Sequence, residues 1–144
     1  MSKSKLLFVC IHNSARSQMA EAFLNVLCGD HFEAKSGGIE AGSLNPLVVV
    51  SMAEIGIDIS AQRSKKALDF IAAGELFDYV ITVCDESSAE RCPVFPGGSK
   101  RLHWGFTDPS GFVGSDEEKI ERTRVVRDAI KARVQEFCST AGTG

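Results

Sequence analysis

Apolar and polar positions follow two different periods along the chain. Short, nearly unbroken apolar runs at residues 6–10 and 78–84 are typical of buried strands, and the second is rich in β-branched residues. Weaker patterns of the same kind occupy residues 32–36 and 101–104. We therefore expect four strands, of which the first and third are the most apolar.

Helical periodicity separates these runs. Residues 17–27 place apolar side chains on one face, and residues 64–73 form a shorter pattern that stops at a glycine. Another helix is expected over residues 46–55, because Pro46 suits the first turn of a helix and a glycine follows the segment. A long final helix is expected over 115–137, where a serine and three acidic residues form a helix start.

This alternation of strands and helices predicts an α/β fold. We expect a single domain over residues 1–144, with a mainly parallel four-stranded sheet and helices on both faces. In such folds the active site lies beyond the carboxyl ends of the strands. Cys10 and Cys84 each end a predicted strand, so both thiols should lie at the same edge if those strands are parallel neighbours.

Residues 10–17 carry the clearest chemical signal. A loop between a strand and a helix start directs backbone amides at one point, where the helix dipole favours an anion. Arg16 adds a planar set of donors that can bind two oxygens of a tetrahedral oxyanion. The same positive charges favour the thiolate form of Cys10, so the loop is predicted to hold a nucleophile beside its substrate.

Composition and charge exclude several classes of protein. A net charge of −3 without a lysine-rich block argues against nucleic-acid binding. The first apolar run is too short for a signal peptide, and nothing approaches a membrane span, so we expect a cytoplasmic protein. We also expect a monomer.

The spacing of the cysteines and histidines argues against a disulfide framework and against a zinc site. The five cysteines are odd in number and scattered, unlike a secreted disulfide framework, and Cys28 and Cys138 are expected to be bystanders. His31 and His103 lack the spacing to cysteines that a zinc site needs. We expect no metal.

Several motifs occur in order along the chain: C-I-H-N-S-A-R-S-Q-M-A-E-A, S-G-G-I-E-A-G-S-L-N-P, G-I-D-I-S, T-V-C, R-C-P and H-W-G-F-T-D-P. With these motifs the chain resembles the thioredoxin-coupled arsenate reductases, which are built on the low-molecular-weight tyrosine phosphatase fold. The resemblance extends from about residue 6 to residue 137. It implies that the substrate is arsenate and that thioredoxin is the external reductant, with no other cofactor.

The resemblance also implies roles for individual residues. Cys10 matches the nucleophile, Asp108 the general acid, and Cys84 and Cys92 the two thiols that complete a disulfide relay. Arg16 joins the loop in binding the oxyanion. The implied oxyanion-binding set is Cys10, Ile11, His12, Asn13, Ser14, Ala15, Arg16 and Ser17.

Some members of this family bind a monovalent cation that supports the loop. Asn13, Glu21 and Ser36 match three of its ligands, whereas Lys65 stands at about the position of an aspartate. We therefore expect the Lys65 ammonium to replace the cation. His12 stands where a glycine is common, and histidine is one of the side chains that tolerate a positive φ there.

The segment between Cys84 and Cys92 is expected to rearrange during the reaction. In one continuous helix the two cysteines would lie about 12 Å apart, whereas a disulfide requires Cα atoms within about 7 Å. The same two thiols separate the alternative functions. A phosphatase acting on phosphotyrosine or small phosphate esters through a Cys10 phospho-enzyme needs neither of them, and a non-enzymatic oxyanion or arsenic sensor would bind without turnover.

Overall fold

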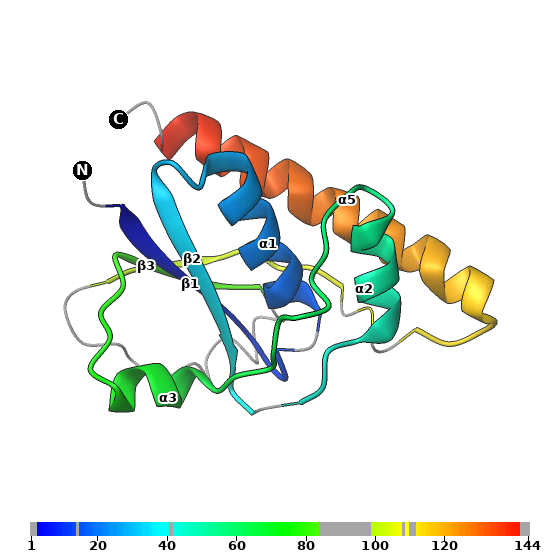
Figure 1. Ribbon diagram of the computed structural model, residues 1–144, viewed down its shortest axis with the longest axis horizontal. Coiled ribbons are helices and arrows are strands. Elements are labelled where there is room, and N and C mark those ends of the chain that lie inside the picture. The colour runs from blue at the N-terminus through cyan, green and yellow to red at the C-terminus, as the bar shows by residue number, and fades with distance from the viewer. Residues whose placement is uncertain are drawn as a thin grey trace.

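A computed structural model describes residues 3–13, 15–40, 42–83, 99–107, 109 and 112–141 (Figure 1). Strands and helices alternate along these residues, as the apolar pattern predicts. The strands are β1 (Ser4–Cys10), β2 (Phe32–Gly38), β3 (Tyr79–Thr82) and β4 (Lys100–His103). The helices are α1 (Arg16–Cys28), α2 (Pro46–Ala53), α3 (Ala67–Ala72) and α5 (Asp116–Ala141).

The four strands form one parallel sheet in the order β2-β1-β3-β4. The predicted α/β fold, a single domain with a four-stranded parallel sheet, is confirmed. β1 and β3 are neighbours, with Val9 opposite Thr82, so their carboxyl ends lie at the same edge. Cys84, which was expected at this edge, lies outside the described residues.

Side chains of β1 alternate between the two faces of the sheet. Leu6, Phe8 and Cys10 belong to a core shared with α1, α2 and α5, whereas Leu7 and Val9 pack with Ala67 of α3. Figure 1 shows α3 on the opposite side of the sheet from α1 and α5. Every one of these β1 residues is at most 2% exposed, which makes β1 the central strand that both layers bury.

The first residue of α5 is set by local contacts, whereas that of α3 is set by contacts with a distant segment. α5 begins as predicted, because the Ser115 hydroxyl accepts a hydrogen bond from the Glu118 amide and donates one to its carboxylate. α3 begins at Ala67, later than residue 64, because Ser64 and Lys65 are bonded to the loop after β1. None of the helices in the described part of the chain has the length and apolar character needed to cross a membrane.

Cys28 and Cys138 are joined by a disulfide, with their Cα atoms 6.0 Å apart. Both were expected to be bystanders, and the structure instead gives them a bond to each other. The bond connects the last residue of α1 to the C-terminal part of α5, two helices that pack against each other. The partners are 110 residues apart in sequence, so spacing alone could not reveal them.

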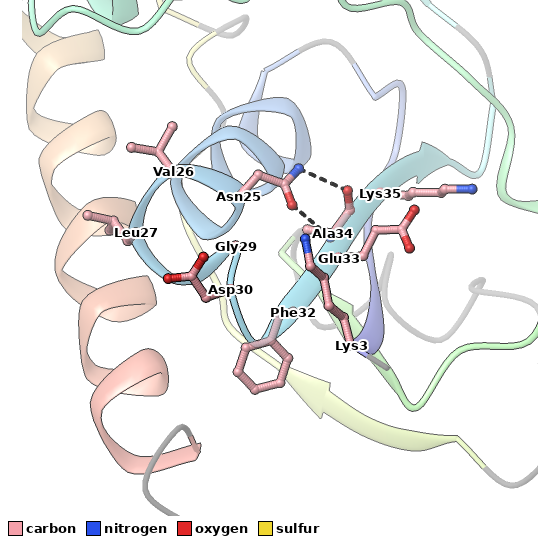
Figure 2. A pocket seen from close by; sticks show the side chains of 10 residues that line it. All are labelled: Lys3, Asn25, Val26, Leu27, Gly29, Asp30, Phe32, Glu33, Ala34 and Lys35. Atoms are coloured by element: carbon pink, nitrogen blue, oxygen red, sulfur yellow. Dashed lines mark hydrogen bonds between the residues drawn. The ribbon is translucent and has the colours of Figure 1, made fainter. Parts of the chain in front are cut away.

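Asn25 ties α1 to the outer strand of the sheet. Its side-chain amide donates to the Ala34 carbonyl at 3.1 Å and accepts from the Ala34 amide at 2.9 Å. Figure 2 shows both bonds at the wall of an open groove of about 570 Å³ between the end of α1 and β2. None of the predicted site residues that the structure describes lines this groove.

Glu75 joins β1 and β2 from the segment after α3. Its carboxylate accepts hydrogen bonds from Lys5 at 2.8 Å and from Lys35 at 2.5 Å. Partial burial raises the pKa of this carboxyl, but the two lysines outweigh that effect, so the pKa lies below its ordinary value.

We expect Glu75→Gln to lower the free energy of unfolding at pH 7 and to have a smaller effect at pH 3. A carboxyl whose folded pKa is lowered stabilises the protein above its unfolded pKa of about 4.3, and that contribution disappears as pH falls through the folded pKa. Urea titrations at the two pH values measure the difference. Replacing the exposed Glu33 by Gln is the matched control, and equal losses in both variants would contradict the role given to Glu75.

Candidate active site

The Cys10 sulfur lies at the end of β1 and is held by two groups of the following loop. The Asn13 amide donates to Sγ at 3.1 Å, and the Ser17 hydroxyl lies 2.8 Å from it. Ser17 Oγ already accepts a hydrogen bond from the Asn13 side chain at 2.7 Å, which leaves the hydroxyl hydrogen for the sulfur. Two polar groups of the loop therefore converge on the Cys10 sulfur.

Carbonyl groups of the loop are anchored from outside. The Cys10, Ile11 and His12 carbonyls accept hydrogen bonds from the amides of residues 39, 40 and 42 at 3.0, 2.8 and 3.0 Å. Ser64 adds a second bond to the His12 carbonyl at 2.7 Å. Because the amide of a trans peptide points away from the preceding carbonyl, the loop amides turn inward. The described part of the loop backbone thus has the form that the predicted anion cradle requires.

Asn13 adopts the left-handed conformation, with φ of 53°. His12, at the position where a glycine is common, does not; asparagine is one of the side chains that accept this conformation most readily. Gly38 closes the loop from behind, since a Cβ there would lie 2.9 Å from the Asn13 nitrogen. The loop is therefore fixed by one strained residue and one close approach of backbone to backbone.

Gln18 holds Asn13 in this conformation, and the sequence analysis missed it. Its side-chain nitrogen donates to the Asn13 carbonyl and to Asn13 Oδ1, both at 3.0 Å, and to the Arg63 carbonyl at 2.8 Å. Gln62 in turn donates to Gln18 Oε1 at 2.5 Å. Gln18 is fully buried. Nothing in the helical pattern distinguishes it from a polar residue facing solvent.

The N-terminus of α1 completes the cradle. Ala15, which precedes the helix, has no side-chain acceptor for the first amides, and the first turn contains no acidic residue. Arg16 is only 3% exposed, and its guanidinium donates to the Phe106 carbonyl at 3.1 Å. This contact brings the segment just before Asp108 to the loop.

Four predicted site residues lie outside the described residues: Ser14, Cys84, Cys92 and Asp108. The expected rearrangement between Cys84 and Cys92 falls in the same part of the chain. The other predicted members of the site are brought together: Cys10, Ile11, His12, Asn13, Ala15, Arg16 and Ser17 around the loop, and Glu21, Ser36 and Lys65 beside it. Ser64 is a further contact that sequence analysis missed.

Glu21, Ser36 and Lys65 meet beneath the loop. The Ser36 hydroxyl donates to Glu21 Oε1 at 3.0 Å, and the Lys65 ammonium lies 4.0 Å from the same oxygen while donating to the Arg63 carbonyl at 2.8 Å. Burial raises the pKa of the Glu21 carboxyl, opposed by Lys65 and Ser36. Among the described residues no group of three or more His, Cys, Asp or Glu side chains is placed to hold a metal ion.

Comparison with known proteins decides the family. The family model described as low molecular weight phosphotyrosine protein phosphatase matches residues 5–142. The chain belongs to this family. Within the low molecular weight phosphatase family, it is 44% identical to an arsenate reductase of Bacillus subtilis (strain 168) over 142 residues, covering 97% of this chain and 99% of that protein.

Two solved structures extend the similarity to three dimensions. One is an arsenate reductase in the phosphate binding state, with a TM-score of 0.75 and 32% identity over 95% of this chain and 98% of the other. Another is a thioredoxin-dependent arsenate reductase of Corynebacterium glutamicum, with a TM-score of 0.67 and 30% identity. The alignment covers 96% of this chain and 61% of that one. The resemblance that the motifs indicate is confirmed.

If Lys65 takes the place of a cation, catalysis by this member of the phosphatase family will not depend on potassium. With choline chloride as the only salt, we expect Lys65→Met to lower kcat/KM for arsenate about tenfold. Potassium chloride should recover most of that loss, since the potassium ion supplies the missing positive charge beside Glu21. The exposed neighbour Lys66 provides the control Lys66→Met. Strong potassium activation of the unmodified protein would refute the substitution of ammonium for metal.

Proposed function

We propose that this chain reduces arsenate to arsenite, with thioredoxin as the external reductant. The observation that carries the proposal is the buried Cys10 thiol, which receives hydrogen bonds from Asn13 and Ser17 inside an anion-binding loop. The similarity to arsenate reductases over nearly the whole chain identifies arsenate as the anion. The reaction is expected to take place in the cytoplasm, where thioredoxin is kept reduced.

The loop would bind and activate arsenate in the first step. Its inward amides, the N-terminus of α1 and Arg16 hold three arsenate oxygens, while the Cys10 thiolate attacks arsenic. Asp108 would donate a proton to the departing oxygen, so that water leaves. Cys10 is then bonded to arsenic, which is still in its oxidised state.

Reduction would occur when Cys84 attacks the Cys10 sulfur. The sulfur–arsenic electron pair stays with arsenic, arsenite leaves, and a Cys10–Cys84 disulfide forms. Cys92 would then attack Cys84, freeing Cys10 and presenting a Cys84–Cys92 disulfide to thioredoxin. Two electrons thus pass from a pair of thiols to arsenic, and thioredoxin restores them.

Oxidation of NADPH in the presence of thioredoxin and thioredoxin reductase tests the proposal. We expect steady oxidation that requires arsenate and this chain. Hydrolysis of a phenyl phosphate is measured in parallel, because the same loop could transfer a phosphoryl group through Cys10. Ester hydrolysis without arsenate turnover would identify a phosphatase, and binding of arsenate without any turnover would identify a sensor.

Cys92→Ser separates the relay from ester hydrolysis. Without the last thiol we expect about one arsenite per protein and then no further reaction, since the Cys10–Cys84 disulfide is not passed on. Any phosphate-ester hydrolysis should remain unchanged in this variant. Continuous thioredoxin-dependent turnover by Cys92→Ser would overturn the three-thiol relay while leaving arsenate reduction itself intact.

A further inference from the structure

The Cys28–Cys138 disulfide has no part in the reaction proposed above. Its position separates it from Cys10, because Cys10 lies at the N-terminal end of α1 and Cys28 is the last residue of that helix. The thirteen residues of α1 place the two ends about 18 Å apart at 1.5 Å per residue. Direct exchange between Cys10 and this disulfide would require the two sulfurs to meet, which an intact α1 prevents.

Small molecules can reach this disulfide. Cys28 is 9% exposed, Cys138 is half-buried, and both line a cavity of about 450 Å³ that is open to solvent. The cavity shares Leu27 and Asp30 with the groove of Figure 2. His31, Gln135 and Ser139 form the remaining wall. The opening gives a small thiol access to the bond and favours Cys138, the more exposed residue of the pair, as the point of attack.

We propose that Cys28 and Cys138 form a second redox site, which exchanges with low-molecular-weight thiols and fastens the C-terminal end of α5 to α1. A thiolate attacks the Cys138 sulfur, the Cys28–Cys138 bond breaks, and Cys28 leaves with the electron pair and takes up a proton. A second thiol then releases Cys138 and carries away the small-molecule disulfide. The reverse exchange with such a disulfide closes the site again.

The local electrostatics distinguish this site from the catalytic one. Cys28 ends α1 and Cys138 lies near the end of α5, where the negative ends of the helix dipoles disfavour a thiolate. Cys10 lies at the opposite, positive end of α1. A poor leaving thiolate slows exchange. The Cys28–Cys138 disulfide is therefore reduced slowly. Its redox state follows the concentration of the surrounding thiols and does not change with each catalytic turnover.

A variant that keeps only these two cysteines isolates the site. In Cys10→Ser/Cys84→Ser/Cys92→Ser we expect the oxidised protein to show no free thiol and a mass two hydrogens below that of the reduced chain. Peptide mapping should join Cys28 to Cys138. Dithiothreitol is then expected to expose both thiols and to lower the thermal midpoint by roughly 10 °C, because the bond closes a loop of more than a hundred residues.

A second pair of variants provides the control and the separation from catalysis. Cys28→Ala/Cys138→Ala, with its serine counterpart in case alanine packs poorly, should melt at the lower temperature with or without dithiothreitol. Arsenate turnover should stay within about twofold of the unmodified chain. Free thiols in the oxidised three-serine variant, or an unchanged midpoint on reduction, would refute the site. Loss of turnover after one cycle would place the pair in the relay instead. The thiol counts and melting temperatures are measured without arsenate, so they test this site even if the proposed function is wrong.

Discussion

Replacing Cys10 by serine is expected to reduce arsenate turnover by at least about a thousandfold. The Asn13 amide and the Ser17 hydroxyl contact the Cys10 sulfur, and a serine hydroxyl in the same place is a much weaker nucleophile than sulfur. Serine also cannot form the disulfide through which arsenic is reduced. The first consequence slows the attack on arsenic and the second blocks the reduction that follows, so no slow pathway through this side chain is left.

Binding must be measured beside turnover for this variant. The loop amides and Arg16 remain in Cys10→Ser, so we expect phosphate, as an arsenate analogue, to bind within about tenfold of its original affinity. A native thermal midpoint would show that the chain folds. Turnover within tenfold of the unmodified chain would eliminate Cys10 as the nucleophile.

Arg16→Lys is expected to lower kcat/KM for arsenate by about a hundredfold to a thousandfold. Arg16 is buried at the start of α1 and its guanidinium is fixed by the Phe106 carbonyl, so the guanidinium plane has a defined direction. A lysine keeps the charge but not the planar pair of donors that binds two oxygens at once. The loss should appear mainly in kcat, if the arginine binds the transition state more tightly than arsenate.

Arg122 offers a matched control on the same chain. It also donates from its guanidinium to a backbone carbonyl, that of Val113, but it is exposed on α5. We expect Arg122→Lys to leave kcat/KM within about twofold. Equal values of kcat/KM for Arg16→Lys and Arg122→Lys would disprove that the planar guanidinium of Arg16 binds two oxygens of the oxyanion.

Strong apolar runs made the centre of the fold predictable. β1 and β3 are buried on both faces, and such strands are recognisable because their side chains have no polar alternation. β4 was a weaker prediction, and every one of its residues is exposed. The start of α3 was placed too early, since the bonds that keep Ser64 and Lys65 out of the helix come from residues more than fifty positions away.

The candidate site likewise contains residues that the sequence could identify and residues that depend on distant contacts. Cys10 and Arg16 could be identified because a strand, a loop and a helix start follow one another directly in the chain. Gln18 could not be identified, because its partners Asn13, Gln62 and Arg63 become visible only when two distant segments meet. The Cys28–Cys138 bond was missed for a similar reason: it depends on how α1 and α5 pack, and no spacing rule encodes that.

A sheet grows most readily at an outer strand, where unpaired backbone groups can accept a strand from another molecule. β2 is such an outer strand, and Asn25 occupies the outward amide and carbonyl of Ala34 near its middle. An incoming strand would find its pairing interrupted there and would have to displace both bonds. Together with the bond from the Gly38 amide to the Lys65 carbonyl, Asn25 therefore leaves little of the outer edge of β2 open to a strand from another copy of this chain.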